Sequence, residues 1–230
     1  MKNRRLLFMI VVFSAALSFS FGNLYQDNLP PAVKILSPKE NTIIKPGGSV
    51  SYRLSVSDKE DGNSEFDEIN VKEVLLEVKY QRASRAPQNT KDTVGLNLIR
   101  GSNCLNCHNF NSKSIGPSFF EISKRYPGTK TNLDSLTKNI QKGSTGTWGK
   151  EKMPSHPELT VSEIKSTVNW ILKNGSNSDI SYFNGTDGNF QLPPNKTGYF
   201  LLTASYMDHG PKSGKGKKLI GADRVIISAR

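Results

Sequence analysis

The pentapeptide Cys-Leu-Asn-Cys-His, residues 104–108, constrains this chain more than any other stretch. Cys104 and Cys107 are the only two cysteines among 230 residues, and His108 directly follows the second. Two thiols and an imidazole at this spacing suit four kinds of site: a disulfide, a zinc site, a thioredoxin-type redox pair and a covalent haem attachment. The rest of the sequence must decide among them.

The haem attachment fits best. A disulfide between cysteines three positions apart closes a loop too short to staple a fold. A zinc site needs four ligands, and beyond Cys104, Cys107 and His108 only His156 and His209 remain, with no second C-x-x-C. A thioredoxin-type pair accompanies a βαβ pattern, which is not visible here. C-x-x-C-H is the attachment signature of c-type haem, so we predict one covalent haem c, bound through both thiols.

A haem of this kind also needs axial ligands. The imidazole next to the second thiol, His108, is the expected proximal ligand. Its other ring nitrogen requires a hydrogen-bond acceptor. The carbonyl of Pro117, in the sequence Ile-Gly-Pro at 115–117, is our candidate, although such a sequence also occurs in an ordinary turn.

Methionine is the expected distal ligand. After residue 22 the chain contains only Met153 and Met207. Met153 precedes Pro154, which stiffens its loop, and a thioether at this position raises the reduction potential of a haem iron. Met207 lies in a strand-like stretch and is expected to pack in a core. His156 is a less favoured alternative to Met153.

Several further motifs lie in order around these residues: IGPSF, KRYPG, GSTGTWGKEKMPSHP and TVNWIL. Together with CLNCH they resemble the class I c-type cytochromes, especially the small bacterial kind, over residues 91–178. The resemblance implies an all-α domain in which Trp148 contacts a haem propionate and Met153 supplies the family's distal sulfur. One position departs from the family: Gly95 is near its usual place before the first cysteine, but the aromatic residue beside it is replaced by Leu98 or Ile99.

The last helix of that region can also be predicted from local signals. Thr160 and Glu163 form a capping box, and Gly175 is placed to end the helix. Trp170 is expected to pack against the first helix. The predicted apolar face comprises Val161, Ile164, Val168 and Ile171.

The regions on either side of 91–178 show the alternating pattern of β-strands. The apolar positions are Val50, Tyr52, Leu54, Val56, Val74, Leu76, Val78 and Tyr80 before it, and Phe200, Leu202, Ala204 and Tyr206 after it, with further runs at 33–36, 190–192 and 225–227. Together the flanks, 31–90 and 180–230, supply roughly the 100 residues of a seven-strand sandwich. We therefore predict a multidomain α+β chain, with an all-α cytochrome inserted into one all-β sandwich. Two small separate β units are the alternative.

The flanks carry two fainter resemblances. The stretch VKILSPKENTIIKPGGSVSYRLSVSDKEDG resembles immunoglobulin-like or cadherin-like extracellular modules. FLLTASYMDHG resembles closing strands beside cytochrome domains in secreted proteins of the sugar-dehydrogenase type. Both resemblances support a sandwich and leave open whether it binds a ligand.

The first 22 residues have the layout of a signal peptide. Lys2, Arg4 and Arg5 precede an apolar run at 6–17, and small residues follow. The run is short for a membrane span, so an uncleaved anchor is the lesser alternative. We predict a periplasmic or extracellular protein with no stable membrane span after cleavage.

The net charge is +11 and falls to +8 when the three positive charges at Lys2, Arg4 and Arg5 are removed. A basic surface favours acidic partners, and export argues against nucleic acid. The acidic turn at Asp58, Glu60 and Asp61 is a weak candidate for a calcium site, because it lacks a complete ligand loop.

These observations predict an exported carrier of single electrons that is not an enzyme. Its partners would be redox proteins, a dehydrogenase or an oxidase, with an acidic docking surface. An envelope or extracellular adaptor, whose sandwich binds carbohydrate or protein while the haem senses or assists, is the alternative. A peroxidase-type enzyme would need an open iron site, and no acid–base constellation accompanies the haem residues.

Overall fold

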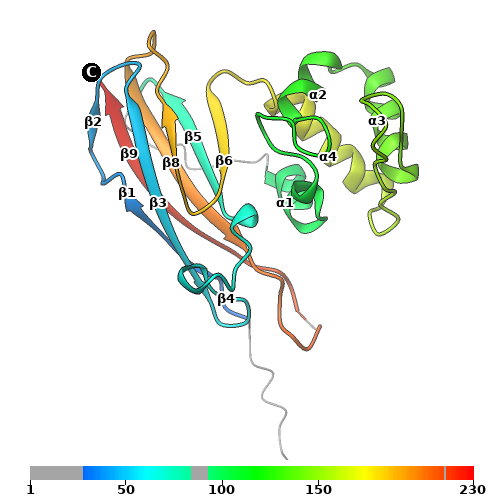
Figure 1. The fold of residues 1–230 in the computed structure, drawn as a ribbon, viewed down its shortest axis with the longest axis horizontal. Helices are drawn as coiled ribbons and strands as arrows, with labels where there is room; N and C mark the ends of the chain where they lie inside the picture. Colours follow the sequence, from blue (N-terminus) through cyan, green and yellow to red (C-terminus); the bar gives the residue numbers. More distant parts are fainter. Residues whose placement is uncertain (1–27, 84–92, 215) are drawn as a thin grey trace, which may run out of the picture.

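A computed structural model describes residues 28–83, 93–214 and 216–230, and shows two β-sheets beside a group of helices (Figure 1). The predicted signal peptide lies outside these residues. Among the described residues, no helix has both the length and the hydropathy needed to cross a bilayer. The strands are β1 (Ala32–Ser37), β2 (Ile43–Ile44), β3 (Ser49–Asp58), β4 (Gly62–Asn63), β5 (Leu75–Gln81), β6 (Ile180–Asn184), β7 (Asp187–Gln191), β8 (Gly198–Met207) and β9 (Ile220–Ala229). The helices are α1 (Thr93–Gly101), α2 (Phe119–Arg125), α3 (Lys130–Lys142) and α4 (Val161–Asn174), with short 3-10 helices η1 (Ser64–Phe66), η2 (Val71–Glu73) and η3 (Cys104–Asn106).

Both sheets combine strands from the two sides of the helical segment. One sheet has the order β1-β3-β4, with β7 also paired to β3. The other has the order β2-β9-β8-β5-β6. The alternative of two separate β units is therefore wrong, because β7 pairs with β3 and β5 lies between β6 and β8.

The sheets face each other across one shared core. The alternation predicted for β3 and β8 is confirmed, since one face of each strand is buried and contributes to the same cluster. The buried members from these two strands are Val50, Tyr52, Leu54, Val56, Phe200, Leu202, Ala204 and Tyr206. The strand-period pattern of the sequence is thus the pattern of a two-sheet core.

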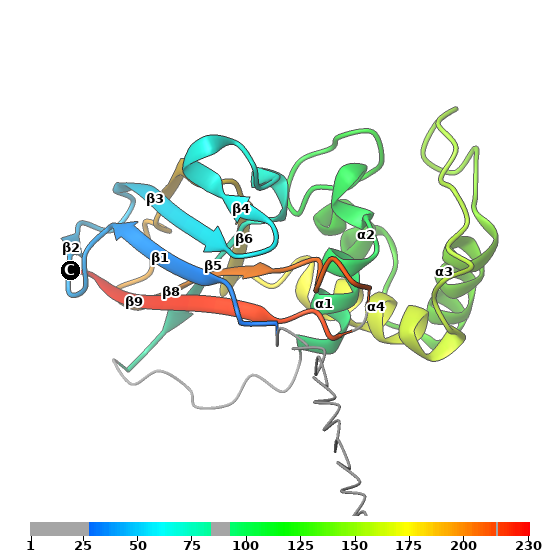
Figure 2. The same ribbon diagram turned by 90° about the horizontal axis from the view of Figure 1, so that it is seen from below.

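The chain leaves the second sheet at the end of β5 and returns to it at the start of β6, the neighbouring strand. Lys79 pairs with Ile180, and the Tyr80 amide donates to the Asp179 carbonyl at 2.8 Å. The helices consequently pack on the outer side of this sheet (Figures 1 and 2). Leu75 is 1% exposed because it faces the helices, while Leu76, at 0%, faces the core between the sheets.

Local signals account for α4. The Thr160 hydroxyl accepts from the Glu163 amide, and the Glu163 carboxylate accepts from the Thr160 amide, so the predicted capping box is present. Ile164, Val168 and Ile171 are buried as expected. Val161 is an exception, at 44% exposed, so the apolar face begins one turn later than predicted.

Two glycines in the helices are required by close contact. A Cβ at Gly95 would lie 2.4 Å from the Trp170 Cβ, so glycine allows α1 and α4 to cross there. Trp170 packs against α1, where Ile99, one of the two aliphatic candidates for the family's aromatic position, is fully buried. Gly175 follows α4 with a right-handed backbone, φ −59°, rather than the left-handed one typical of a helix-ending glycine. It is needed because a Cβ would lie 2.5 Å from the Phe119 carbonyl oxygen.

Arg100 makes a second connection between the helices and the sheet. Its Nη2 donates to the Ser205 hydroxyl at 2.7 Å and to the Ser205 carbonyl at 3.2 Å. Burial lowers the pKa of Arg100 to about 10, partly offset by the negative charge of Glu77. The guanidinium therefore remains charged at neutral pH and holds the end of α1 against β8.

Candidate functional site

The pentapeptide forms a tight turn directly after α1. Asn103 has a left-handed backbone, φ 59°, and η3 begins at Cys104. The amides of Cys107 and His108 both donate to the Cys104 carbonyl, at 3.2 and 2.9 Å. Both thiols and the imidazole consequently line the same cavity, whose volume is about 510 Å³.

His108 has a defined tautomer. Its Nδ1 lies 2.6 Å from the Pro117 carbonyl oxygen, which can only accept, so Nδ1 carries the proton and the Nε2 lone pair is free. Burial lowers the pKa of His108, an effect opposed by the hydrogen bond to Pro117. Gly116 is needed beside the ring, because a Cβ there would lie 2.6 Å from the His108 Cε1. The local structure therefore presents a neutral imidazole with a free ring nitrogen, the form that binds metal.

Cys104 and Cys107 are both free thiols, and both are partly buried. Burial raises the pKa of Cys104 to about 11. A reactive redox cysteine has a lowered pKa instead. The raised pKa of Cys104 thus does not favour a thioredoxin-type pair.

Met153 is held at the base of a closed loop that also lines the cavity. The amide of Met153 donates to the Ser144 carbonyl at 2.9 Å, and the Ser144 amide donates back at 3.1 Å. Gly143 has φ +77°, and a Cβ at that position would lie 2.8 Å from the Met153 carbonyl oxygen. Backbone pairing and this glycine therefore fix where the Met153 side chain begins.

Trp148 lies in the same loop and lines the cavity. The Arg125 guanidinium lies 4.5 Å from the centre of its ring, and Arg125 Nη1 donates to the Thr147 carbonyl at 3.1 Å. Tyr126 packs edge-on against the indole. Sequence reasoning did not assign this role to Arg125; the motif Lys-Arg-Tyr-Pro-Gly contains it, but nothing in that motif indicates its contact with Trp148.

His156, the alternative ligand, also lines the cavity. Its Nδ1 lies 2.7 Å from the Glu158 carboxylate, and its side chain is 14% exposed. Glu158 was not identified from the sequence, although its position two residues after His156 was visible there. The Glu158 contact engages only Nδ1 of His156, as the Pro117 carbonyl does in His108, so this contact does not by itself decide between His156 and Met153 as the distal ligand.

Met207 lies outside the cavity. It is the last residue of β8, and a Cβ at Gly101 would lie 3.2 Å from its Cε. The packing role predicted for Met207 agrees with this position.

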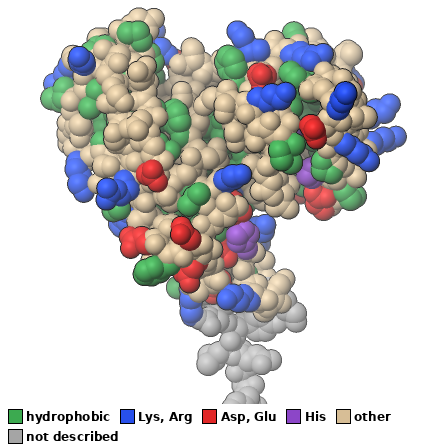
Figure 3. Space-filling view, viewed as in Figure 1, with side chains coloured by type: hydrophobic (Ala, Val, Ile, Leu, Met, Phe, Trp, Pro, Cys, Tyr) green, Lys and Arg blue, Asp and Glu red, His purple; other side chains and the backbone are tan. Residues whose placement is uncertain are grey.

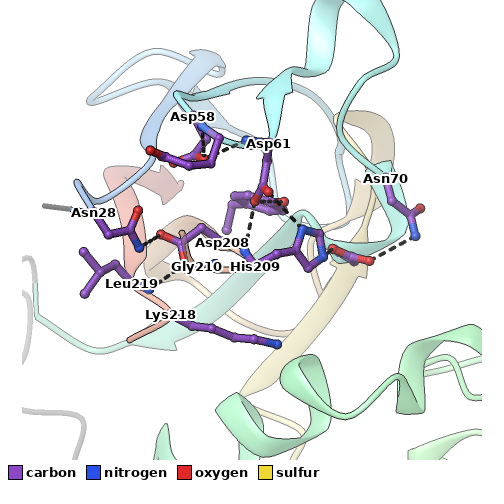
Figure 4. A network of polar contacts seen from close by, with 12 residues as sticks. Asn28, Asp58, Asp61, Asn70, Asp208, His209, Gly210, Lys218 and Leu219 are labelled. Carbon is purple, nitrogen blue, oxygen red and sulfur yellow. Dashed lines mark hydrogen bonds and ion pairs between the residues drawn. The ribbon is translucent and has the colours of Figure 1, made fainter. Parts of the chain in front are cut away.

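His209 and the acidic turn form a separate polar network (Figure 4). The His209 ring nitrogens lie 3.1 Å from Asp61 Oδ1 and 3.0 Å from Glu73 Oε2. Asp61 also accepts hydrogen bonds from the Tyr206 hydroxyl and the His209 amide. The Asp58 carboxylate accepts from the amides of Glu60 and Asp61. No group of three or more acidic, histidine or cysteine side chains suited to a metal ion occurs among the described residues.

The lining of the cavity fits the predicted haem. Its walls are largely apolar, and three sulfur atoms and one free imidazole nitrogen belong to residues that line it. Thiol, thioether and imidazole are the donors by which protein chains hold haem. Lining residues besides these include Ile115, Pro117, Phe119, Ile122, Leu136, Ile140, Trp148, Pro154, Leu159, Val168 and Ile171.

Comparison with known proteins points in the same direction. The sequence model of the family described as Cytochrome c matches residues 95–175. Cytochrome c-552 of Hydrogenobacter thermophilus is 36% identical over 33% of this chain and 76% of its own length. Cytochrome c-551 of Azotobacter vinelandii is 36% identical over 34% of this chain and 94% of its own length.

Among solved structures, the wild-type cytochrome c552 of Nitrosomonas europaea is 30% identical over 34% of this chain and 95% of its own, with a TM-score of 0.32. These matches cover about a third of the chain, the part that contains the cavity.

Proposed function

The chain belongs to the cytochrome c family through residues 95–175, and from this premise we propose that it is an exported carrier of single electrons whose haem is held by His108 and Met153. Members of the family carry covalently attached haem c, and its small relatives are electron carriers. When bound, haem c supplies an iron that gains or loses one electron.

The roles of the pentapeptide follow from its geometry. Cys104 and Cys107 provide the sulfurs of the two thioether bonds. His108 provides the Nε2 lone pair, while its Nδ1–H is held by the Pro117 carbonyl, which makes the imidazole a better donor. With haem bound, the apolar lining would limit the access of water, which helps to set the reduction potential.

Met153 provides the distal sulfur in this proposal. If His108 and Met153 both bound the iron, a substrate would have no place on it, as expected of an electron carrier and not of an enzyme. The observation that carries the proposal is that residues from two segments, 104–108 and Met153 in its paired loop, line one apolar cavity. Trp148, fixed by Arg125, is the proposed contact to a propionate.

Replacing each methionine in turn tests the ligation. Met153→Ala should abolish the methionine–iron charge-transfer band of the oxidised protein and lower the reduction potential, because the thioether that stabilises the reduced iron is lost. Met207→Ala is the matched control, because Met207 lies outside the cavity. It should leave both the charge-transfer band and the reduction potential unchanged. An unchanged spectrum in Met153→Ala would reject Met153 as ligand, and His156→Ala would then identify whether the imidazole takes its place.

The remaining features of the proposal concern organisation and location. We propose a signal peptide at 1–22, a cytochrome domain at 91–178 and a sandwich assembled from 31–90 and 180–230. Export to the periplasm or beyond agrees with the covalent haem of the family. The proposed partner is a dehydrogenase or oxidase with an acidic surface.

The surface charge supports such a partner. Lys and Arg side chains gather over the part of the surface formed by α2 and α3 (Figure 3). The exposed basic residues of this region are Lys124, Arg125, Lys130, Lys138, Lys142, Lys150 and Lys152. Raising the ionic strength should therefore slow electron transfer to an acidic partner, measured by stopped-flow absorbance.

A second candidate function is that of an adaptor whose sandwich binds carbohydrate or protein. Its support is that the strands outside 95–175 enclose a hydrophobic core of their own, separate from the cluster that contains the helices. A chain in which residues 91–178 are replaced by a short linker separates the two. Binding to isolated envelope material that survives this deletion would favour the adaptor, whereas loss of electron transfer with no residual binding favours the carrier.

A further inference from the structure

We infer that Tyr182, on β6 of the sheet, is a positioning residue for the proximal ligand His108. This inference rests on the proposed ligation and adds to it a role for a strand outside the matched cytochrome region. It is carried by hydrogen bonds and ring contacts that connect β6 to the loop between His108 and α2.

The loop is closed on itself by backbone hydrogen bonds. The Gly116 amide donates to the Cys107 carbonyl at 2.8 Å, and the Phe119 amide donates to the Asn109 carbonyl at 3.0 Å. The Ser118 side chain caps α2 at the end of the loop. The Pro117 carbonyl, which accepts from His108, therefore moves only if the whole loop moves.

Tyr182 holds this loop from outside in two ways. The Asn111 side chain donates to the Tyr182 carbonyl at 2.9 Å. The ring of Phe110 stacks on the Tyr182 ring, with centres 4.9 Å apart and planes at 27°. Both contacts fix consecutive residues of the loop against the same residue of β6.

A series of rings extends this support to the ligand. Phe110 packs edge-on against Phe119 at 5.4 Å, and Phe119 stacks on the His108 imidazole at 5.6 Å, with planes at 16°. Trp170 contacts both Phe110 and Tyr182 and closes the side of the group. Tyr182 is thus the member of this series that belongs to the sheet.

The strand itself is a firm support. Tyr182 pairs with Glu77 in the antiparallel register of β5 and β6 and is 6% exposed. Side chains alternate along a strand, so the next residue, Phe183, faces the other side and stacks on Phe190 in the core between the sheets. Tyr182 and Phe183 therefore pack on opposite faces of the same strand, so a substitution at Phe183 is a matched control for one at Tyr182.

The test compares Tyr182→Leu with Phe183→Leu in the haem-loaded chain, with Tyr182→Phe as the conservative variant. Hydrogen exchange of the Gly116 and Phe119 amides, read by mass spectrometry or NMR, should become about tenfold faster in Tyr182→Leu, the order expected for the loss of one buried aromatic pair. The reduction potential should rise, because a looser hydrogen bond to Pro117 makes His108 a weaker donor. Phe183→Leu should leave the exchange rates and the reduction potential near their wild-type values. Tyr182→Phe, which keeps the aromatic ring, should also leave both near wild type.

Asn111→Ala gives a second variant that leaves the sheet intact, since Asn111 is exposed. It should accelerate exchange of the same amides about fivefold through the loss of one hydrogen bond. Equal exchange and equal potentials in Tyr182→Leu and Phe183→Leu, with no effect of Asn111→Ala, would overturn the inference.

Failure of the proposed function would look different. It would show in the unmodified chain, as a spectrum without histidine and methionine ligation. The hydrogen-exchange comparison would still report whether β6 holds the loop.

Discussion

At the scale of single residues, Gly116 is the position where a minimal change should have a large effect. A methyl group there would lie 2.6 Å from His108 Cε1 and 2.9 Å from Nδ1. Gly116→Ala should therefore displace the imidazole from the Pro117 carbonyl and destabilise the fold by about 1–3 kcal/mol, the usual cost of overpacking a buried site. Chemical denaturation of the haem-loaded protein measures the change in free energy of unfolding.

Gly128→Ala is the matched control. A Cβ at Gly128 meets nothing within 4 Å, and its backbone is not left-handed. Its stability should stay within about 0.5 kcal/mol of wild type. A Gly116→Ala variant as stable as this control would show that the contact with His108 is not tight in solution.

The sequence was sufficient to place the residues whose chemistry is local. An imidazole ligand needs an acceptor nearby, which predicts the Pro117 carbonyl, and that carbonyl does accept from His108. Arg125 and Glu158 were not assigned roles. Their partners, Trp148 and His156, depend on how loops fold back in space, and neither the Arg–Trp contact nor the His–Glu pair has a fixed spacing that identifies it.

At the scale of elements, the turn between β3 and β4 is attached to the end of β8 by the Asp61 carboxylate (Figure 4). Burial alone would raise the pKa of Asp61, but hydrogen bonds from the His209 amide, the Tyr206 hydroxyl and the His209 ring together lower it. A lowered pKa in the folded state means that the folded state binds the proton more weakly than the unfolded chain does. The stabilisation is therefore complete above the ordinary value of 3.8 and is lost as the pH falls below it.

Asp61→Asn should remove this part of the acid sensitivity. Thermal unfolding of wild type and variant, followed from pH 6 downward, should show curves that converge as the pH falls below about 4, because protonated aspartic acid and asparagine are both uncharged. Asp187→Asn, an exposed position on β7, is the control and should keep the wild-type profile. A constant difference between wild type and Asp61→Asn at all pH values would contradict the assignment.

Most elements were predictable because they carry one-dimensional signals. Alternation identified β3 and β8, and the Thr160–Glu163 capping box located the start of α4. The two-residue strand β2, which pairs in parallel with β9, has no such signal, since its existence depends on a partner almost two hundred residues away. Gly175 is required because the Phe119 carbonyl oxygen of α2 lies close to it, and not because of its own backbone conformation. This contact between distant residues could not be predicted from the sequence.

At the scale of the whole molecule, the adjacency of β5 and β6 predicts that the two sheets fold without the helices. A chain with residues 82–178 replaced by a short glycine–serine linker should retain a cooperative urea transition, because Lys79 and Ile180 are already paired. It should be less stable by roughly 2–4 kcal/mol, since Leu75 and Tyr182 lose the helices that cover them. Circular dichroism with urea titration measures both properties.

The control for this deletion adds Leu75→Thr, which removes an apolar side chain that the deletion exposes. The deletion chain that also carries Leu75→Thr should be more soluble than the deletion chain alone. Its urea transition should be no less cooperative. A broad, non-cooperative transition in both chains would show that the sheets depend on the helical segment for their structure.

The return of strand periodicity after residue 178 was enough to predict that the two flanks share one β structure. The partition of strands between two sheets was not predictable, because pairing such as β3 with β7 joins residues more than a hundred positions apart. Nor does a repeating pattern in one strand reveal that its second face is covered. Leu75 and Tyr182 are buried under the helices, and the local alternation does not encode that contact.

The sheet that packs against α1 also restricts the directions from which another protein can collide productively with this one. Arg100 and the packing of Leu75 and Tyr182 join the helices to the second sheet, so a redox partner that approaches from the far side of the strands is separated from the cavity by the sheets. Electron exchange falls steeply with separation, so in the proposed carrier encounters from the far side of the sheets should contribute little to the rate. In the proposed carrier, the β structure would therefore restrict the orientations in which a partner can exchange electrons with the haem.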